Sequence, residues 1–301
     1  MGRSAWMDID WRAHQRWVML DGQAVNTIEL DARPPGAHQP DSQPLDSQPV
    51  VFVHGLAGSW PNWLEQLPVL GAERRVIAMD LPGFGHSPLP AGEISISGYA
   101  RLLDRLLGEL GIHAAAVVGS SMGGFIAAEL AIAFPQRVER LVLVNAAGLS
   151  TGGRRARRAL ATVRRIEGVS AVYATWLASD ADAVARRRRT REANLGLLVR
   201  HPGRLPWPLA AELLRGAGTP GFIPAWQALA HYDFRERLPE IACPTLIVWG
   251  EDDRLVDVRD ADAYASAIAG SRKVIFKDTG HLSMLERPDA FNALLKEFLE
   301  E

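Results

Sequence analysis

Cysteine, long apolar runs and net charge are all scarce in this sequence of 301 residues. The single cysteine, Cys243, excludes an intramolecular disulfide and any metal site built from several thiolates, and its place before an apolar strand pattern predicts a buried, inert thiol. No stretch stays apolar for the roughly 18 residues that a membrane-spanning helix needs, and residues 1–17 lack the apolar core of a secretory signal. The formal net charge of −2 argues against a whole-protein role on nucleic acid or on a membrane surface. We therefore expect a soluble, cytoplasmic protein.

What the sequence does contain is a strand, a sharp turn and a helix in direct succession. Residues 114–118 are small or β-branched and predict a buried strand, whereas residues 125–134 predict a helix rich in Ala, Leu and Ile. Between them, residues 119–123 read Gly-Ser-Ser-Met-Gly and fit the pattern G-x-S-x-G, with Ser121 at the tip of the turn. The Ser121 hydroxyl then lies at a helix N-terminus, where free N–H groups favour developing negative charge. Alone, this pattern is equally consistent with a purely structural turn.

The remaining chain alternates between strand and helix patterns. A hairpin over residues 16–30 turns at Asp21 and Gly22, and residues 33–49, rich in Pro, Gln, Asp and Ser, predict an exposed loop. Further strands are predicted at residues 50–53, 76–79, 138–144, 245–249 and 273–276, and further helices at residues 60–70, 97–110, 260–268 and 288–299. This alternation predicts an α/β fold with a mostly parallel sheet. A helical pattern interrupts it, so we expect a core from residues 1–149 and 236–301 and a helical insertion over residues 150–235.

Two later motifs supply what a nucleophilic serine needs, which is a base within hydrogen-bond reach and a carboxylate that orients the base. Residues 249–253 read Trp-Gly-Glu-Asp-Asp after one predicted strand, and residues 279–281 read Thr-Gly-His after the next. The order Ser121, Asp253, His281 is the order expected of a triad on this architecture. A glycine-rich loop also follows the strand at residues 50–53, and it can present the backbone N–H of Leu56 to a ligand.

Together these motifs resemble those of the α/β-hydrolase superfamily over nearly the whole chain. The His-Gly loop at residues 54–59, the loop at residues 80–87, the turn at residues 119–123, Gly-x-x-Asp at residues 250–253 and Gly-His at residues 280–281 match in type, order and spacing. The resemblance implies an eight-stranded sheet with a mobile helical cap between the sixth and seventh strands, where the insertion falls.

The resemblance also implies roles for particular residues. Ser121 would be the nucleophile, His281 the general base and then the general acid, and Asp253 the carboxylate that fixes the histidine tautomer. The backbone N–H groups of Leu56 and Met122 would form the oxyanion hole. Neither a metal nor an organic cofactor is implied.

Several neighbours of Asp253 are alternatives for the acid. Glu251, Asp252 and Asp257 lie close in sequence, but Asp253 occupies the acidic position of the Gly-x-x-Asp pattern. Asn145 stands where some relatives place the acid, yet an amide cannot act as a carboxylate. Asp257 also departs from the family, since relatives usually have proline there.

Other polar residues near the motifs are expected to be structural. Ser120 is the wrong neighbour within the pentapeptide, and His54 and His86 are expected to brace their loops. An aspartate nucleophile, as in haloalkane dehalogenases and epoxide hydrolases, is excluded by Ser121.

The insertion is unusually basic. Residues 151–191 contain eleven arginines against three acidic residues; the arginines are at positions 154, 155, 157, 158, 164, 165, 186, 187, 188, 189 and 191. They form either a solvated outer face or a surface that steers anionic substrates or docks on an acidic carrier or lipid surface. The aromatic residues Trp60, Trp63, Trp176, Phe222 and Trp226 either line an apolar acyl pocket or belong to the core.

The expected function is hydrolysis of carboxylic esters through an acyl-enzyme on Ser121, as in a carboxylesterase or lipase. The expected partner is a small-molecule ester, anionic or carrier-linked, and not a nucleic acid. Two other enzyme classes remain open, carbon–carbon bond hydrolases of the meta-cleavage type and cofactor-free haloperoxidases. A non-catalytic ligand-binding protein on the same scaffold is the remote alternative.

Overall fold

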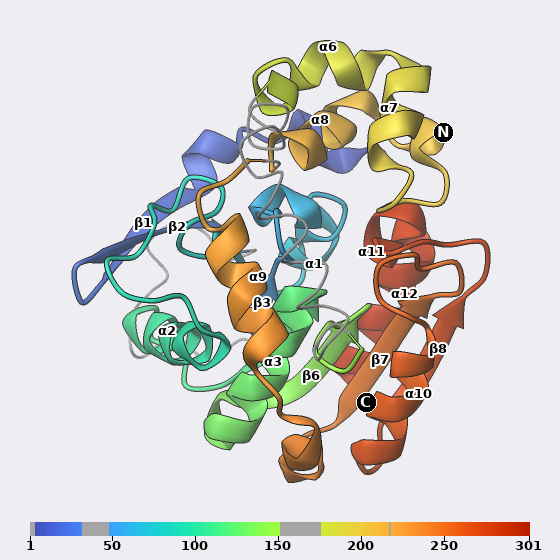
Figure 1. Cartoon of the computed structure of the whole chain (residues 1–301). Helices are drawn as coiled ribbons and strands as arrows, with labels where there is room; N and C mark the ends of the chain where they lie inside the picture. The colour runs from blue at the N-terminus through green and yellow to red at the C-terminus, as the bar shows by residue number, and fades with distance from the viewer. Residues whose placement is uncertain (1–3, 32–47, 151–175, 217) are drawn as a thin grey trace.

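The computed structural model describes residues 4–31, 48–150, 176–216 and 218–301. The loop expected at residues 33–49 lies almost wholly outside these residues, as does the first part of the insertion. Within the described residues, helices cover both faces of a single sheet (Figure 1).

The regular elements follow one another as the sequence predicts. The strands are β1 (Gln15–Leu20), β2 (Gln23–Leu30), β3 (Val50–Val53), β4 (Val76–Met79), β5 (Ala115–Ser120), β6 (Val138–Val144), β7 (Thr245–Gly250) and β8 (Arg272–Phe276). The α-helices are α1 (Leu67–Gly71), α2 (Ile96–Glu109), α3 (Met122–Ala133), α6 (Ala181–Arg186), α7 (Arg188–Leu195), α8 (Trp207–Arg215), α9 (Phe222–His231), α10 (Arg259–Ala267), α11 (Ser283–Glu286) and α12 (Pro288–Glu300). The 3-10 helices are η1 (Ala5–Asp8), η2 (Trp11–His14), η3 (Trp60–Trp63), η4 (Pro135–Arg137), η5 (Pro202–Arg204) and η6 (Arg235–Glu240).

The eight strands are arranged in the order β1-β2-β4-β3-β5-β6-β7-β8. β1 and β2 form the expected antiparallel hairpin, and positive φ angles of 49° at Asp21 and 84° at Gly22 allow its two-residue turn. β2 pairs antiparallel with β4, while the strands from β4 across to β8 run parallel. The predicted eight-stranded, mostly parallel sheet is confirmed.

Alternate residues of the central strands enter two separate cores. Phe52 of β3 faces one side, where its ring lies 4.8 Å from that of Trp63 among residues of α1, α11 and α12. Val51 and Val53 face the other side, among residues of α2, α3 and α10. Because both faces are covered, these strands are apolar at every position, which explains their continuous hydrophobic runs.

The helix predicted over residues 60–70 is wrong as a continuous element. It is divided into η3 and α1, with Pro68 in the first turn of α1. In one unbroken helix, Pro68 would lack an N–H donor and its ring would strike the carbonyl of Leu64, so the helix restarts there.

Between β6 and β7 the described chain forms α6, α7, α8 and α9, of which α6 to α8 gather at the top of Figure 1. These residues contact the loops at the carboxyl ends of three strands. Gly221 N–H donates to Gly83 O (2.9 Å) after β4, and Leu198 O accepts from His281 N (3.0 Å) after β8. Gly216 lies so close to the carbonyl of Ala57, after β3, that a side chain would not fit. The described part of the insertion, residues 176–216 and 218–235, therefore lies over the edge of the sheet where the candidate site is expected; its role as a cap stays a prediction.

Six of the eleven arginines, at positions 154–165, lie outside the described residues. Three of the other five have structural contacts. The Arg186 guanidinium lies 3.7 Å from the ring centre of Trp207, and Arg188 pairs with Glu192 at 2.8 Å. Arg191 is buried and donates to the carbonyls of Ala185 (2.9 Å) and Gly203 (3.2 Å). In the described parts of the chain, no helix is both long and apolar enough to cross a membrane.

Candidate active site

Ser121 sits in a strained backbone conformation between β5 and α3. Its φ and ψ of 57° and −119° are unusual for a residue with a side chain and cost on the order of 1–3 kcal/mol. The neighbouring backbone holds it there, because Ser121 N donates to Val144 O (2.9 Å) and Ser121 O accepts from Ala147 N (3.0 Å). Glycine is required at position 123, where a Cβ would strike the carbonyl oxygens of Val53 and His54. The predicted sharp turn is thus built by close packing of backbone on backbone.

His281 and Asp253 form a buried hydrogen-bonded pair. The distance from His281 Nδ1 to Asp253 Oδ2 is 2.8 Å, and both side chains are almost fully shielded from solvent. They follow β8 and β7, and Ser121 follows β5. Since parallel strands end at the same edge of a sheet, all three residues lie at its carboxyl edge.

The Asp253 carboxylate accepts hydrogen bonds on both oxygens. Oδ1 accepts from the N–H groups of Leu255 (2.8 Å) and Val256 (3.0 Å), and Oδ2 accepts from Asn145 Nδ2 (2.8 Å) as well as from His281. Burial alone would raise the pKa of Asp253, but the neighbouring His281 and these hydrogen bonds hold it below its ordinary value. Asp253 therefore stays ionised and keeps the proton of His281 on Nδ1, which leaves Nε2 free to accept one.

Asn145 is a member of this network that sequence reasoning did not assign. It is fully buried, has a φ of 48°, and also accepts a hydrogen bond from Ser283 Oγ (2.7 Å) on its Oδ1. Its N–H donates to Val248 O of the adjacent strand (2.9 Å). Asn145 thus connects β6, the Asp253 loop and α11. The sequence placed Asn145 directly after a predicted strand, but this position led only to the conclusion that an amide cannot be the acid.

The loop after β3 approaches Ser121 closely. A Cβ at Gly55 would lie 2.8 Å from the Ser121 Cβ, so only glycine permits this approach. The N–H of the next residue, Leu56, donates to no group within the described residues. Met122 is the first residue of α3, where the N–H has no partner inside the helix. The two N–H groups proposed from the sequence therefore belong to the segments that flank Ser121.

His54 and Asp80 hold the two loops beneath the insertion. Both ring nitrogens of His54 are engaged, Nδ1 with Gly55 O (2.8 Å) and Nε2 with the N–H of Leu81 (2.9 Å), and its burial lowers its pKa. The fully buried Asp80 accepts from Trp60 N (2.7 Å) on Oδ1 and from His86 N (2.9 Å) on Oδ2. His54 thus braces the two loops, as the sequence suggested. His86 contributes its backbone N–H, while its exposed ring lies 3.6 Å from Asp80, so a bracing role for this side chain stays a prediction.

Two of the alternative acids form ion pairs with arginines. Asp252 lies 3.4 Å from Arg200, and the partly exposed Asp257 pairs with Arg259, whose hydrogen bonds lower the pKa of Asp257 to about 2. The third, Glu251, is exposed. Ser120 is buried and faces the interior.

Trp63 and Cys243 differ in how deeply they are buried. Trp63 is fully buried against Phe52 and belongs to the core instead of a ligand pocket. Cys243 is half-buried, less than predicted, and its pKa is raised by burial. In the described part of the chain, no three His, Cys, Asp or Glu side chains gather as metal ligands.

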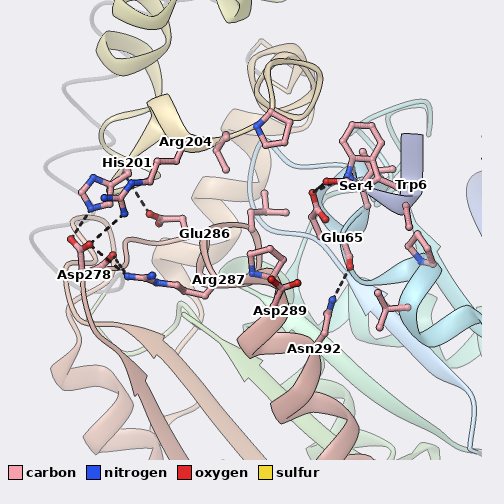
Figure 2. A pocket seen from close by; sticks show the side chains of 18 residues that line it. Ser4, Trp6, Glu65, His201, Arg204, Asp278, Glu286, Arg287, Asp289 and Asn292 are labelled. Atoms are coloured by element: carbon pink, nitrogen blue, oxygen red, sulfur yellow. Dashed lines mark hydrogen bonds and ion pairs between the residues drawn. The ribbon is translucent and has the colours of Figure 1, made fainter. Parts of the chain in front are cut away.

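A cavity of about 570 Å³ lies between η1, α1, the start of α12 and residues 201–206 (Figure 2). His201 and Arg204 point toward Asp278 on one wall, and Glu65 accepts from Ser4 Oγ and Trp6 Nε1 on the other. None of the predicted catalytic residues lines it.

Residues 48–288 match the family described as alpha/beta hydrolase fold, and the chain belongs to that family. It is 32% identical over 262 residues to the dihydrolipoyllysine-residue acetyltransferase component of an acetoin cleaving system from Cupriavidus necator; the alignment covers 84% of this chain and 64% of the relative, less than two thirds of its length. It is also 32% identical over 262 residues to a 2-hydroxy-6-oxononadienedioate/2-hydroxy-6-oxononatrienedioate hydrolase from Klebsiella pneumoniae, with 83% and 86% covered. Among solved structures, the enol-lactonase from Burkholderia xenovorans has a TM-score of 0.73 at 24% identity, covering 95% of this chain and 100% of that one, which shows a shared fold. The superfamily prediction is confirmed, and the chain has the fold of a hydrolase.

Proposed function

We propose that this protein is a serine hydrolase that cleaves carboxylic esters through an acyl-enzyme on Ser121. The observation that carries the proposal is the strained Ser121 at the same sheet edge as the buried His281–Asp253 pair. Backbone strain of this kind persists where the surrounding structure enforces it, and a buried histidine paired with an ionised carboxylate is the arrangement that a general base requires.

In the proposed reaction, Ser121 Oγ attacks the ester carbonyl while Nε2 of His281 takes its proton. The negative charge that develops on the carbonyl oxygen is stabilised by the N–H groups of Leu56 and Met122, each worth about 3 kcal/mol in the transition state. His281 then returns the proton to the departing alkoxide. Water, deprotonated by the same histidine, then attacks the acyl carbonyl. The bond from this carbon to Ser121 Oγ breaks, Oγ takes the proton back from His281, and the acid is released. Asp253 stays ionised throughout and stabilises the imidazolium.

A second candidate is hydrolysis of a carbon–carbon bond. It is favoured by the 32% identity to a relative named as a 2-hydroxy-6-oxononadienedioate hydrolase. That chemistry needs a substrate whose carbonyl activates the neighbouring carbon–carbon bond, and the chain's residues offer the same base and N–H donors to it. A cofactor-free haloperoxidase and a non-catalytic binding protein remain as further alternatives.

The decisive experiment compares wild type with Ser121→Ala on p-nitrophenyl esters from acetate to palmitate. Activity that is greatest on short chains and disappears in the variant would support a carboxylesterase, and a maximum on long chains a lipase. A 2-hydroxy-6-oxodienoate substrate, followed by loss of its absorbance, tests the second candidate. Ester hydrolysis that survives at near-normal rate in Ser121→Ala would contradict the assignment of the nucleophile. A wild-type serine that a fluorophosphonate does not label would favour the binding protein.

We further propose that residues 150–235 cap the site and select small anionic or carrier-linked esters. Of the described arginines in the basic run, the four at positions 186–189 are exposed, and Arg191 is buried. Steering by such charges is screened by salt. A rate constant on an anionic ester that stays the same from low to high salt, in parallel with a neutral ester as control, would contradict this role.

A further inference from the structure

The backbone that carries His281 is hydrogen-bonded to the insertion. Leu198 O, just after α7, accepts from His281 N (3.0 Å) and from Leu282 N (3.3 Å). The preceding residue, Gly280, also packs against this segment, since a Cβ on it would be 2.8 Å from Arg200 N. The position of the histidine therefore depends on residues that are remote from it in sequence.

Glu286, the last residue of α11, bridges the same two segments. Its Oε1 accepts from Gly280 N (2.8 Å), and its Oε2 accepts from Arg200 N (2.9 Å) and His201 N (3.4 Å). In Figure 2 the Glu286 side chain extends from α11 toward His201. One carboxylate thus satisfies backbone donors on both sides of the contact.

The three backbone donors suit an ionised carboxylate. Burial raises the pKa of Glu286, and the hydrogen bonds from Gly280, Arg200 and His201 oppose that rise by stabilising the charged form. A carboxylate has acceptor sites on both oxygens, whereas an amide offers one acceptor oxygen and would turn its NH₂ group toward a backbone N–H. Hydrogen bonds to a charged acceptor are also stronger than bonds between neutral groups. The chemistry of the site therefore matches glutamate and not its isosteric amide.

A second contact joins the same insertion segment to Asp278, three residues before His281, without involving Glu286. Asp278 accepts from His201 Nε2 (2.7 Å) and lies 3.6 Å from Arg204 Nη1. Arg204 lines the cavity of Figure 2 together with Glu286. Loss of Arg204 would weaken this contact between the same two segments and leave the hydrogen bonds of Glu286 in place, which makes it a matched control.

We propose that Glu286 is a positioning residue for His281. Its hydrogen bonds hold the Gly280 peptide against residues 200–201 and so keep the imidazole in line with Asp253 and Ser121. The inference rests on the proposed function, because it assigns Glu286 an effect that acts through the catalytic histidine.

The test measures Glu286→Gln, Glu286→Ala and Arg204→Gln against wild type. The first readout is the rate constant for labelling of Ser121 by a small fluorophosphonate, which depends on activation by His281 and little on the ester pocket. The second is kcat and KM on a p-nitrophenyl ester, and melting temperature monitors the fold. We expect labelling and kcat to fall about tenfold in Glu286→Gln and up to about a hundredfold in Glu286→Ala, since a misplacement of about 1 Å costs that much. KM should stay within about twofold, and Arg204→Gln should label like wild type.

Labelling within about twofold of wild type in both Glu286 variants would overturn the proposal. So would an equal loss in Arg204→Gln, because general loosening of the insertion would then suffice. If Glu286→Ala does not fold, Glu286→Gln, which keeps the side-chain shape, decides the matter. A wild-type protein that the fluorophosphonate does not label overturns the proposed function itself, whereas normal labelling of wild type and of both Glu286 variants overturns only the role of Glu286.

Discussion

Asparagine in place of Asp253 would keep the shape of the side chain and remove its charge. The carboxylate receives N–H donors on both oxygens, from Leu255 and Val256 on one and from His281 and Asn145 on the other. An amide has one acceptor oxygen, so one of these two pairs of donors would face an NH₂ group. If the oxygen stays with the two backbone donors, the NH₂ group faces His281.

The magnitude follows from this geometry. Facing an NH₂ group, His281 must accept at Nδ1 and carry its proton on Nε2, where it can no longer take the proton of Ser121. A wrong tautomer of this kind lowers kcat about 10⁴-fold, which is about 5 kcal/mol of transition-state stabilisation. The lost hydrogen bonds to a buried charged acceptor should also lower the free energy of unfolding by about 2–3 kcal/mol.

The assay is kcat on the best p-nitrophenyl ester, with urea unfolding of each variant to measure stability. Asp252→Asn and Asp257→Asn are the matched controls, since these carboxylates pair with Arg200 and Arg259 outside the network. Both should keep kcat within about threefold of wild type, because exposed ion pairs contribute little. The reasoning would be refuted if Asp253→Asn kept more than a tenth of the activity, or if either control lost as much as Asp253→Asn.

Three further substitutions test the surrounding framework. Asn145→Ala removes a donor to the Asp253 carboxylate, so kcat should fall about tenfold at unchanged KM and the free energy of unfolding by about 2 kcal/mol; unchanged kinetics would contradict its place in the network. Burial would raise the pKa of Asp80, but His86, His54 and the N–H of Trp60 hold it below its ordinary value. The ionised Asp80 therefore stabilises the folded protein fully above the unfolded carboxyl pKa of about 4. This contribution is lost as pH falls through the lower pKa of the folded state. The stability difference between wild type and Asp80→Asn, from urea unfolding, should therefore shrink below about pH 4, and a constant difference from pH 7 to 3 would be against it. Gly123→Ala places a methyl group against two backbone carbonyls and should lower the free energy of unfolding by about 1–3 kcal/mol. The measurement is thermal unfolding, and an unaltered melting temperature would argue against the close packing of the turn.

Local sequence determined much of the fold. The apolar runs predicted the central strands β3 to β7, because strands buried on both faces must be apolar at each position. The hairpin of β1 and β2 was predicted instead from its two-residue turn at Asp21 and Gly22. The continuous helix predicted at residues 60–70 is wrong, because Pro68 cannot continue a helix and the chain begins a new one there. The antiparallel pairing of β2 with β4 left no local signal, since strand order depends on which edges meet after folding.

For the candidate site, the sequence by itself determined the residue types and their order: a serine between glycines, then an acid, then a histidine, each after a strand. The catalytic roles of Ser121, Asp253 and His281 remain predictions, as do those of the Leu56 and Met122 N–H groups. Only the tertiary structure decided that Asn145 and Ser283 join the Asp253 network. It also decided that Glu286 links Gly280, next to His281, to Arg200 of the insertion. These contacts join backbone and side-chain atoms that are far apart in the chain, so no spacing or periodicity encodes them. They exist because buried donors and acceptors must find partners wherever the packed sheet and helices bring them together.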